Sequence, residues 1–200
     1  METIGPRRLE AFSDGVFAIA ATLLILEIGV DTSRGDLGKQ LTDIWPSYLA
    51  YVTTFLVIGI IWINHHHCVS LIHRVDRTFL FINLLLLLVV SFMPFPTKLV
   101  AQYLQKPDER EAVIAYATTM TVMAVLYNIW WRYARSNRRL ISEHASDAAL
   151  EAVDRAFNPG VPMYGLTLVI AFISPLASVI MTLALAVFYL PSAALFEHGG

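Results

Sequence analysis

Four apolar segments, each about as long as a bilayer is thick, dominate the chain. They cover residues 9–30, 44–64, 78–103 and 112–134. A helix needs about 20 mostly apolar residues to cross the hydrocarbon core, where lipid offers no partners to an open backbone. Hydrophobic residues make up 56% of the chain and charged residues only 15%, which is far from the composition of a soluble domain. The sequence therefore predicts an all-α integral membrane protein.

The last apolar region, residues 161–196, is too long for one ordinary span and is interrupted at Ser174-Pro175. Proline removes a backbone donor and restricts the residue before it, so we expect two shorter spans, 160–174 and 176–196. One long, kinked helix is the alternative, because neighbouring helices can satisfy the backbone groups that an internal proline frees. With two spans here, residues 1–200 form a single domain of six transmembrane helices.

Basic residues are distributed unevenly between the apolar segments, and they accumulate on the cytoplasmic side of membrane proteins. With the amino terminus inside, the inner segments hold nine of them and the outer segments five. The inner set is Arg7, Arg8, Arg74, Arg77, Arg132, Arg135, Arg138, Arg139 and Arg155, and the outer set is Arg34, Lys39, Lys98, Lys106 and Arg110. We therefore expect a multi-pass protein of the cell membrane whose amino and carboxyl termini are cytoplasmic. The polar segment 135–158 would form a cytoplasmic surface helix.

Charge and cysteine content exclude several classes of protein. The net charge is −2, so no basic surface indicates a nucleic-acid partner. The single cysteine, Cys68, excludes an intrachain disulfide framework and a cysteine-rich metal site. No Ser-His-Asp order, glycine-rich phosphate loop or pair of inward carboxylates stands out, so an enzyme has little support in the sequence.

The first apolar segment begins with a polar cluster that includes Ser13 and Asp14. Ionisable groups are costly at a membrane, so a carboxylate there indicates a partner or a water-filled path. One face of the same predicted helix carries Phe12, Gly15, Ile19, Leu23 and Leu26, with Thr22 beside it. This face fits a packing seam with Ser13 as the helix cap, or a pore lining in which branched side chains from several subunits control the passage of ions.

Glu27 lies one turn above Leu23 on the first segment. Its carboxylate could concentrate cations near the outer mouth of a pore, or it could simply mark a solvated helix end.

The second segment ends in Trp62-Ile63-Asn64-His65-His66-His67-Cys68. Consecutive helical residues point about 100° apart, whereas zinc-binding helices place two histidines four apart on one face. The spacing therefore favours hydrogen-bonding or interfacial histidines over a metal site. Trp62 and His65 lie one turn apart, and their ring donors could hold Ser13 or Asp14.

Two further patterns are typical of structural roles. The sequence Phe92-Met93-Pro94-Phe95-Pro96 predicts a kink in the third span. Four aromatic residues near the end of the fourth span have the character of a belt at a membrane boundary, namely Tyr127, Trp130, Trp131 and Tyr133.

The motif Arg8-x-x-x-Phe12-Ser13-Asp14, followed by Gly-Val-Phe-Ala-Ile, resembles the signature of the transmembrane protein 175 family of potassium channels in its short prokaryotic form. Trp62-x-x-His65-His66 resembles a second feature of that family. The resemblance implies a cation channel that favours potassium over sodium and has no cofactor besides the permeant ion. It also implies a homotetramer in the lipid bilayer, with the first helix of each subunit lining a central pore.

The resemblance further implies roles for individual residues. Ile19 would form the tightest layer of the pore, with Leu23 and Leu26 as the next layers towards the outside and Thr22 as a pore-facing hydroxyl. Glu27 stands where an aspartate is expected near the end of the first span. The residues that would position the pore helix, as a buried network that does not contact the ion, are Arg8, Phe12, Ser13, Asp14, Trp62 and His65.

The expected function is therefore passive potassium conduction through a hydrophobic constriction. A proton-coupled secondary transporter or proton pathway is the alternative, because Asp14, Glu27 and the histidines could relay protons. The absence of recognisable inverted repeats in the sequence counts against it. A membrane metalloenzyme that uses the histidine run and a purely structural membrane protein are the remaining alternatives.

Overall fold

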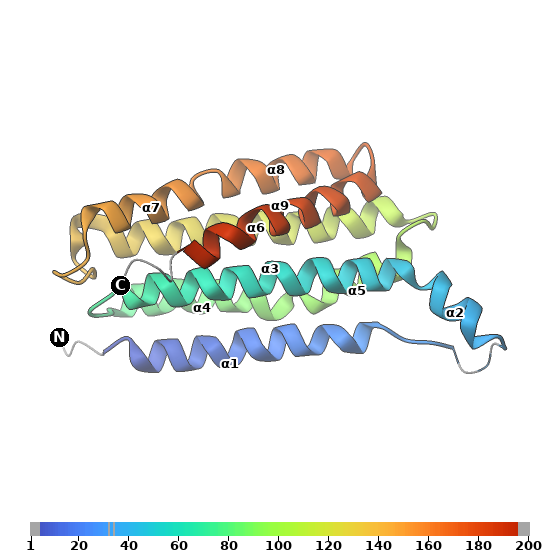
Figure 1. The fold of residues 1–200 in the computed structure, drawn as a ribbon, viewed down its shortest axis with the longest axis horizontal. Coiled ribbons are helices and arrows are strands. Elements are labelled where there is room, and N and C mark those ends of the chain that lie inside the picture. Colours follow the sequence, from blue (N-terminus) through green and yellow to red (C-terminus); the bar gives the residue numbers. More distant parts are fainter. Residues whose placement is uncertain (1–4, 32, 34, 196–200) are drawn as a thin grey trace.

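The fold, given by a computed structural model, is an elongated bundle of helices that run side by side (Figure 1). The structure describes residues 5–195 apart from residues 32 and 34, so residue 196 of the predicted last span lies outside the described part. The helices are α1 (Arg7–Leu23), η1 (Leu24–Glu27), α2 (Leu37–Asp43), α3 (Trp45–Ser70), α4 (Arg77–Phe92), α5 (Pro94–Tyr103), α6 (Glu109–Arg135), η2 (Ser136–Arg138), α7 (Asp147–Phe157), α8 (Gly160–Ala171) and α9 (Pro175–Leu195).

Four helical segments of the described chain are long and apolar enough to cross a membrane. They are Arg7–Glu27, Trp45–Ser70, Arg77–Tyr103 and Glu109–Arg135, which correspond to the four long apolar segments of the sequence. The prediction of an all-α membrane protein is thereby confirmed. The second helix extends to Ser70, well beyond the predicted end at residue 64, because the histidine run continues the helix rather than breaking it.

The third segment is broken where the two prolines predicted a kink. α4 ends at Phe92, and α5 begins at Pro94 with Met93 between them. Neither Pro94 nor Pro96 can donate a backbone hydrogen bond, so the regular ladder of the helix is interrupted at this point.

The region around Pro175 forms two helices, so the alternative of one long, kinked helix is wrong. α8 ends at Ala171, α9 begins at Pro175, and the two pack together as antiparallel neighbours (Figure 1). α8 is shorter than predicted, with 12 residues instead of the 15 in 160–174. At 1.5 Å per residue it covers about 18 Å, less than the roughly 30 Å of a bilayer core. α7 precedes it closely and lies within the polar segment 135–158.

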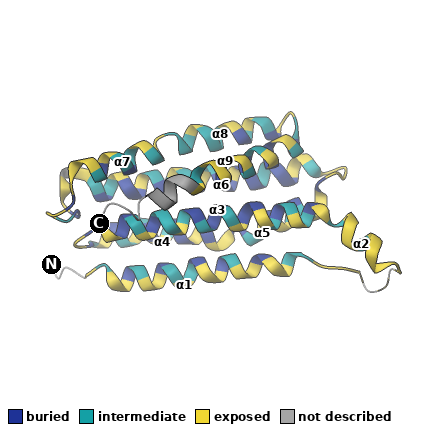
Figure 2. Cartoon of the chain, viewed as in Figure 1, coloured by how far each residue is buried: buried dark blue, intermediate teal, exposed yellow. Residues whose placement is uncertain are grey.

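The core lies along α3 and α6, which contact most of the other helices. Figure 2 shows buried residues along both, whereas α1, at the edge of the bundle, has a broad exposed face. At one end of the core the ring of Trp130 stacks on His65, with 4.9 Å between ring centroids, and lies 5.0 Å from the ring of Phe79. α1 is therefore a peripheral helix that packs on α3 and α4 at the edge of the bundle.

Candidate functional site on the first helix

The apolar face predicted for the first helix is found, and it is exposed in the single chain. Ile19 is 61% exposed, Leu23 42% and Leu26 72%, and Thr22 lies beside them, also exposed. The opposite face packs on the body of the protein and contains the buried residues Leu9, Ser13, Phe17, Ala20 and Leu24. Sequence periodicity therefore grouped residues that share one face of the helix. The structure adds that this face is exposed in the single chain.

The hydroxyl group of Thr22 donates its hydrogen bond within its own helix. Its Oγ1 lies 2.9 Å from the carbonyl oxygen of Ala18 and 3.0 Å from that of Ile19. Because the hydroxyl donates to these carbonyls, the remaining lone pairs of the oxygen are free to accept from, or to coordinate, a group on the exposed side.

The structure contains the predicted contact between Trp62 and Asp14. The indole Nε1 of Trp62, in α3, donates to Oδ1 of Asp14, in α1, at 2.8 Å. Both side chains are partly exposed, and they lie at one end of a groove of about 500 Å³ between α1 and α3. An indole is a donor only, so its N–H complements a carboxylate.

Ser13 and His65 are joined through a residue that the sequence analysis missed. Nε2–H of His65 donates to Oδ1 of Asn83 at 3.0 Å, and Nδ2 of Asn83 donates to Oγ of Ser13 at 3.1 Å. All three side chains are buried. Asn83 interrupts an otherwise apolar run from Phe79 to Val90, and this isolated polar residue is the signal that could have revealed it.

The interpretation of Ser13 as a helix cap is wrong. α1 begins at Arg7, so Ser13 lies inside the helix, where its hydroxyl donates to the carbonyl of Leu9 at 2.8 Å. The hydroxyl therefore serves two contacts, one within α1 and one to α4 through Asn83.

Arg8 and Phe12 are exposed in the single chain, and their role in positioning the pore helix stays a prediction. Arg8 is exposed and Phe12 is 59% exposed, and they line a pocket of about 300 Å³ between α1 and α4. Among the described residues Asp14 pairs with Trp62 rather than with Arg8. The physical reason is the six-residue separation, which places Arg8 and Asp14 on different sides of the helix.

The histidine run joins α3 to its neighbours. His65 is the buried member, whereas His66 is exposed and its Nδ1 lies 3.1 Å from Oε1 of Glu10 in α1. Within the described part of the chain, no three His, Cys, Asp or Glu side chains gather as a metal site would require. The run therefore offers contacts between helices.

Glu27 has a partner at the other end of α1. Its carboxylate lies 3.2 Å from Nζ of Lys98 in α5, and its side chain is only 16% exposed. The interpretation of Glu27 as a solvated helix end is therefore wrong. The ion pair attaches the last turn of the first segment to α5.

Comparison with known proteins gives a consistent result. Residues 8–94, which contain α3, α4 and all of α1 except its first residue, match the family described as the endosomal/lysosomal potassium channel TMEM175. A potassium channel of Chamaesiphon minutus is 40% identical over 186 residues, which cover 91% of this chain and 92% of that relative. A potassium channel of Streptomyces collinus is 44% identical over 171 residues, which cover 84% of this chain and 82% of that one.

A solved structure agrees with these sequence matches. The crystal structure of a lysosomal potassium-selective channel TMEM175 homolog from Chamaesiphon minutus is similar, with a TM-score of 0.85 and 38% identity. The similarity covers 93% of this chain and 96% of that one. On the strength of this nearly full-length match, the chain belongs to the TMEM175 family.

Proposed function

We propose that this protein is a potassium channel of the cell membrane in which the first helices of four identical subunits surround a central pore. The close relatives that match most of the chain are named potassium channels. The observation that carries the proposal is the two-sided character of α1. Its apolar face is exposed, while its other face is held by Asn83, Trp62 and Lys98 on three different helices.

In a closed ring of identical subunits, each copy presents the same surface to the axis. Four copies of α1 would bring Ile19 into one apolar ring, followed by rings of Leu23 and Leu26. An apolar ring offers no ligand that could replace the water around an ion, so discrimination rests on pore width and on the cost of dehydration. We therefore expect a weaker preference for potassium over sodium than a carbonyl-lined filter gives.

The proposed topology has six membrane segments, formed by α1, α3, α4 with α5, α6, α8 and α9, of which α8 is too short to cross the roughly 30 Å core by itself. The beginnings of α1 and α4 and the ends of α3 and α6 lie at one end of the bundle, which carries most of the arginines. By the positive-inside rule this end faces the cytoplasm, together with both termini. The proposal needs no cofactor beyond the permeant potassium ion.

Geometry at the candidate site does not favour the proton-coupled alternative. The indole of Trp62 only donates, so it cannot pass a proton between Asp14 and the histidines. A second route, from His65 to Ser13, runs through the amide of Asn83, which is not an acid–base group near neutral pH.

Ion flux into proteoliposomes tests the proposal through two matched isoleucines. Ile19→Ala should increase potassium flux and reduce the preference over sodium, because the narrowest ring widens. Ile180 in α9 is 52% exposed, similar to Ile19, but it lies on a helix distant from α1 (Figure 1). Ile180→Ala should leave the flux unchanged. Equal flux for both variants would remove Ile19 from the pore, and flux that follows a pH gradient instead of the potassium gradient would support the proton-coupled alternative.

A further inference from the structure

A polar cavity lies at the arginine-rich end of the bundle, away from α1. It occupies about 420 Å³ between the end of α6 and the end of α7. Pockets that hold small molecules commonly measure about 300–1,000 Å³. The lining side chains that matter for its chemistry are Asn128, Trp131, Arg132, Arg135, Asp154 and Asn158.

Arg132 is a positioned cation in this lining. Its Nε donates to Oδ1 of Asn128 at 3.0 Å, and its Nη2 donates to Oδ1 of Asn158 at 3.4 Å. Both partners are neutral amides, and among the described residues no carboxylate lies within ion-pair distance of this guanidinium. The amides therefore orient the planar donor group without cancelling its charge, and N–H groups remain available for a further acceptor.

Among the described residues, the lining contains one carboxylate, and it is already balanced. Asp154 forms an ion pair with Arg135 and accepts a 2.8 Å hydrogen bond from Nε1 of Trp131. Two arginines against one aspartate leave the cavity with one net positive charge. An incoming anion would therefore meet the uncompensated guanidinium of Arg132 rather than a free carboxylate.

The surroundings of the cavity indicate the depth at which it lies in a membrane. The ring of Trp131 packs edge-on against Phe157, with 6.2 Å between centroids, and Tyr127 packs against Phe157 in the same manner at 4.8 Å. Trp131 and Tyr127 are buried within the protein, so they are not the lipid-facing aromatic belt that the sequence predicted for the end of this span, and Trp131 forms a wall of the cavity. The cavity is also at the carboxyl-terminal end of α6, a membrane-length helix.

We propose that this cavity binds the phosphate headgroup of an anionic phospholipid on the cytoplasmic side of the membrane. A guanidinium fork matches phosphate oxygens and gives charge-assisted hydrogen bonds, and basic pockets between membrane helices on this side are suited to such headgroups. The proposal depends on the membrane orientation inferred above, but not on potassium conduction.

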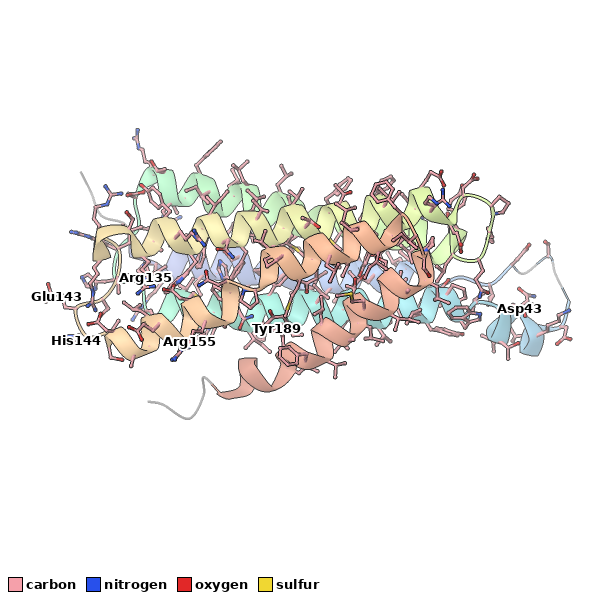
Figure 3. The ribbon with its side chains drawn as sticks, turned by 90° about the horizontal axis from the view of Figure 1, so that it is seen from above. Asp43, Arg135, Glu143, His144, Arg155 and Tyr189 are labelled. Atoms are coloured by element: carbon pink, nitrogen blue, oxygen red, sulfur yellow. The ribbon has the colours of Figure 1, made fainter. Side chains whose placement is uncertain are left out.

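Two arginine variants with the same change in charge distinguish binding at the cavity from attraction by the overall charge of this end of the bundle. Arg132→Gln removes the unpaired cation. Arg155→Gln removes an exposed charge of α7 that does not line the cavity, and Figure 3 shows Arg155 at the edge of α7 turned away from α6, with Arg135 between the two helices. Both variants lower the net charge of the chain by one.

Native mass spectrometry of the detergent-purified full chain measures the binding of phosphatidylglycerol and of phosphatidylcholine with the same acyl chains. Wild type should retain phosphatidylglycerol preferentially. Arg132→Gln should weaken this binding about tenfold, as expected for the loss of one charge-assisted hydrogen bond, whereas Arg155→Gln should not change it. No preference for the anionic lipid, or an equal loss in both variants, would overturn the proposal.

Two further measurements address the binding of soluble phosphate and the failure of a variant to fold. If glycerol phosphate and inorganic phosphate bind the wild type as strongly as the lipid does, the site is a soluble-phosphate site and the lipid assignment fails. If Arg132→Gln does not yield folded protein, a photoactivatable phosphatidylglycerol is crosslinked to the wild type. Labelled peptides should then contain residues 128–136 or 154–158, and labelling elsewhere alone would contradict the site.

Discussion

The indole of Trp62 donates to the carboxylate of Asp14 across the interface of α1 and α3, so a charged group on the proposed pore helix has a single neutral donor as its side-chain partner among the described residues. Trp62→Phe should remove that donor, at a cost of about 0.5–1.5 kcal/mol in the free energy of unfolding, because water can reach the partly exposed carboxylate. The double variant Trp62→Phe/Asp14→Asn should recover part of the loss, since a neutral amide is less costly to leave unpaired. Thermal unfolding in detergent and potassium flux in liposomes measure both effects. A stability of Trp62→Phe equal to that of the wild type would show that the contact is unimportant.

Asn83 is the buried link between α4 and both neighbouring helices. Asn83→Leu should leave Nε2 of His65 without a partner and lower the unfolding free energy by about 1–3 kcal/mol. Ser13→Ala serves as the comparison, because it removes the hydroxyl contacts to Asn83 and to the carbonyl of Leu9 but leaves the Asn83–His65 hydrogen bond intact. Chemical unfolding in detergent should therefore rank Ser13→Ala closer to the wild type. The reverse order would show that the contact to Ser13 is the more important one.

Removing either partner of the ion pair between Glu27 and Lys98 should change the potassium conductance, and the two changes should have opposite signs. Lys98→Gln should leave a free negative charge near the proposed outer mouth and increase potassium conductance, whereas Glu27→Gln should leave a positive charge and decrease it. The double variant should return towards the wild type. These effects should fade at high ionic strength, because about 1 M salt shortens the screening length to roughly 3 Å. Conductance that is the same in all four proteins at low salt would place Glu27 away from the permeation path.

Thr22 offers an oxygen on the exposed face of α1. Thr22→Val keeps the shape and removes the oxygen, so we expect a lower ratio of potassium to sodium flux, while Thr22→Ser should retain the wild-type ratio. Thr42 in α2 makes the same kind of hydroxyl-to-carbonyl contact, with Lys39, and its replacement by valine is the matched control. A ratio that is unchanged in Thr22→Val would exclude a role of this hydroxyl in selectivity.

The sequence predicted those features that depend on neighbours within one helix. The exposed face with Ile19 and Leu23 follows from helical periodicity, and the separation of α8 from α9 follows from the chemistry of Pro175. The end of α3 was misplaced because hydropathy falls at His65 while the helix continues. Polarity marks where a segment leaves an apolar environment, and it does not mark where the backbone hydrogen bonds stop.

The contacts between helices could not be derived in the same way. Asn83 lies 18 residues from His65 and 70 from Ser13, and no periodic pattern encodes pairs at such distances. Lys98 as the partner of Glu27 depends on how α5 continues after the break at Met93, which only the packed structure determines. Arg8 lies six residues before Asp14 on α1, so the pattern of this one helix does not pair the two.

The change from α-helix to 3-10 helix at Leu24 has a consequence for the spacing of the apolar residues on this segment. A 3-10 turn contains three residues and rises about 2.0 Å for each, so Leu26 sits almost directly in line with Leu23 and about 6 Å further along the axis, compared with about 4.5 Å in an α-helix. In a fourfold assembly the two leucines would then form separate collars, with space for a layer of water between them. An ion leaving the first collar could regain part of its hydration shell before it reached the second.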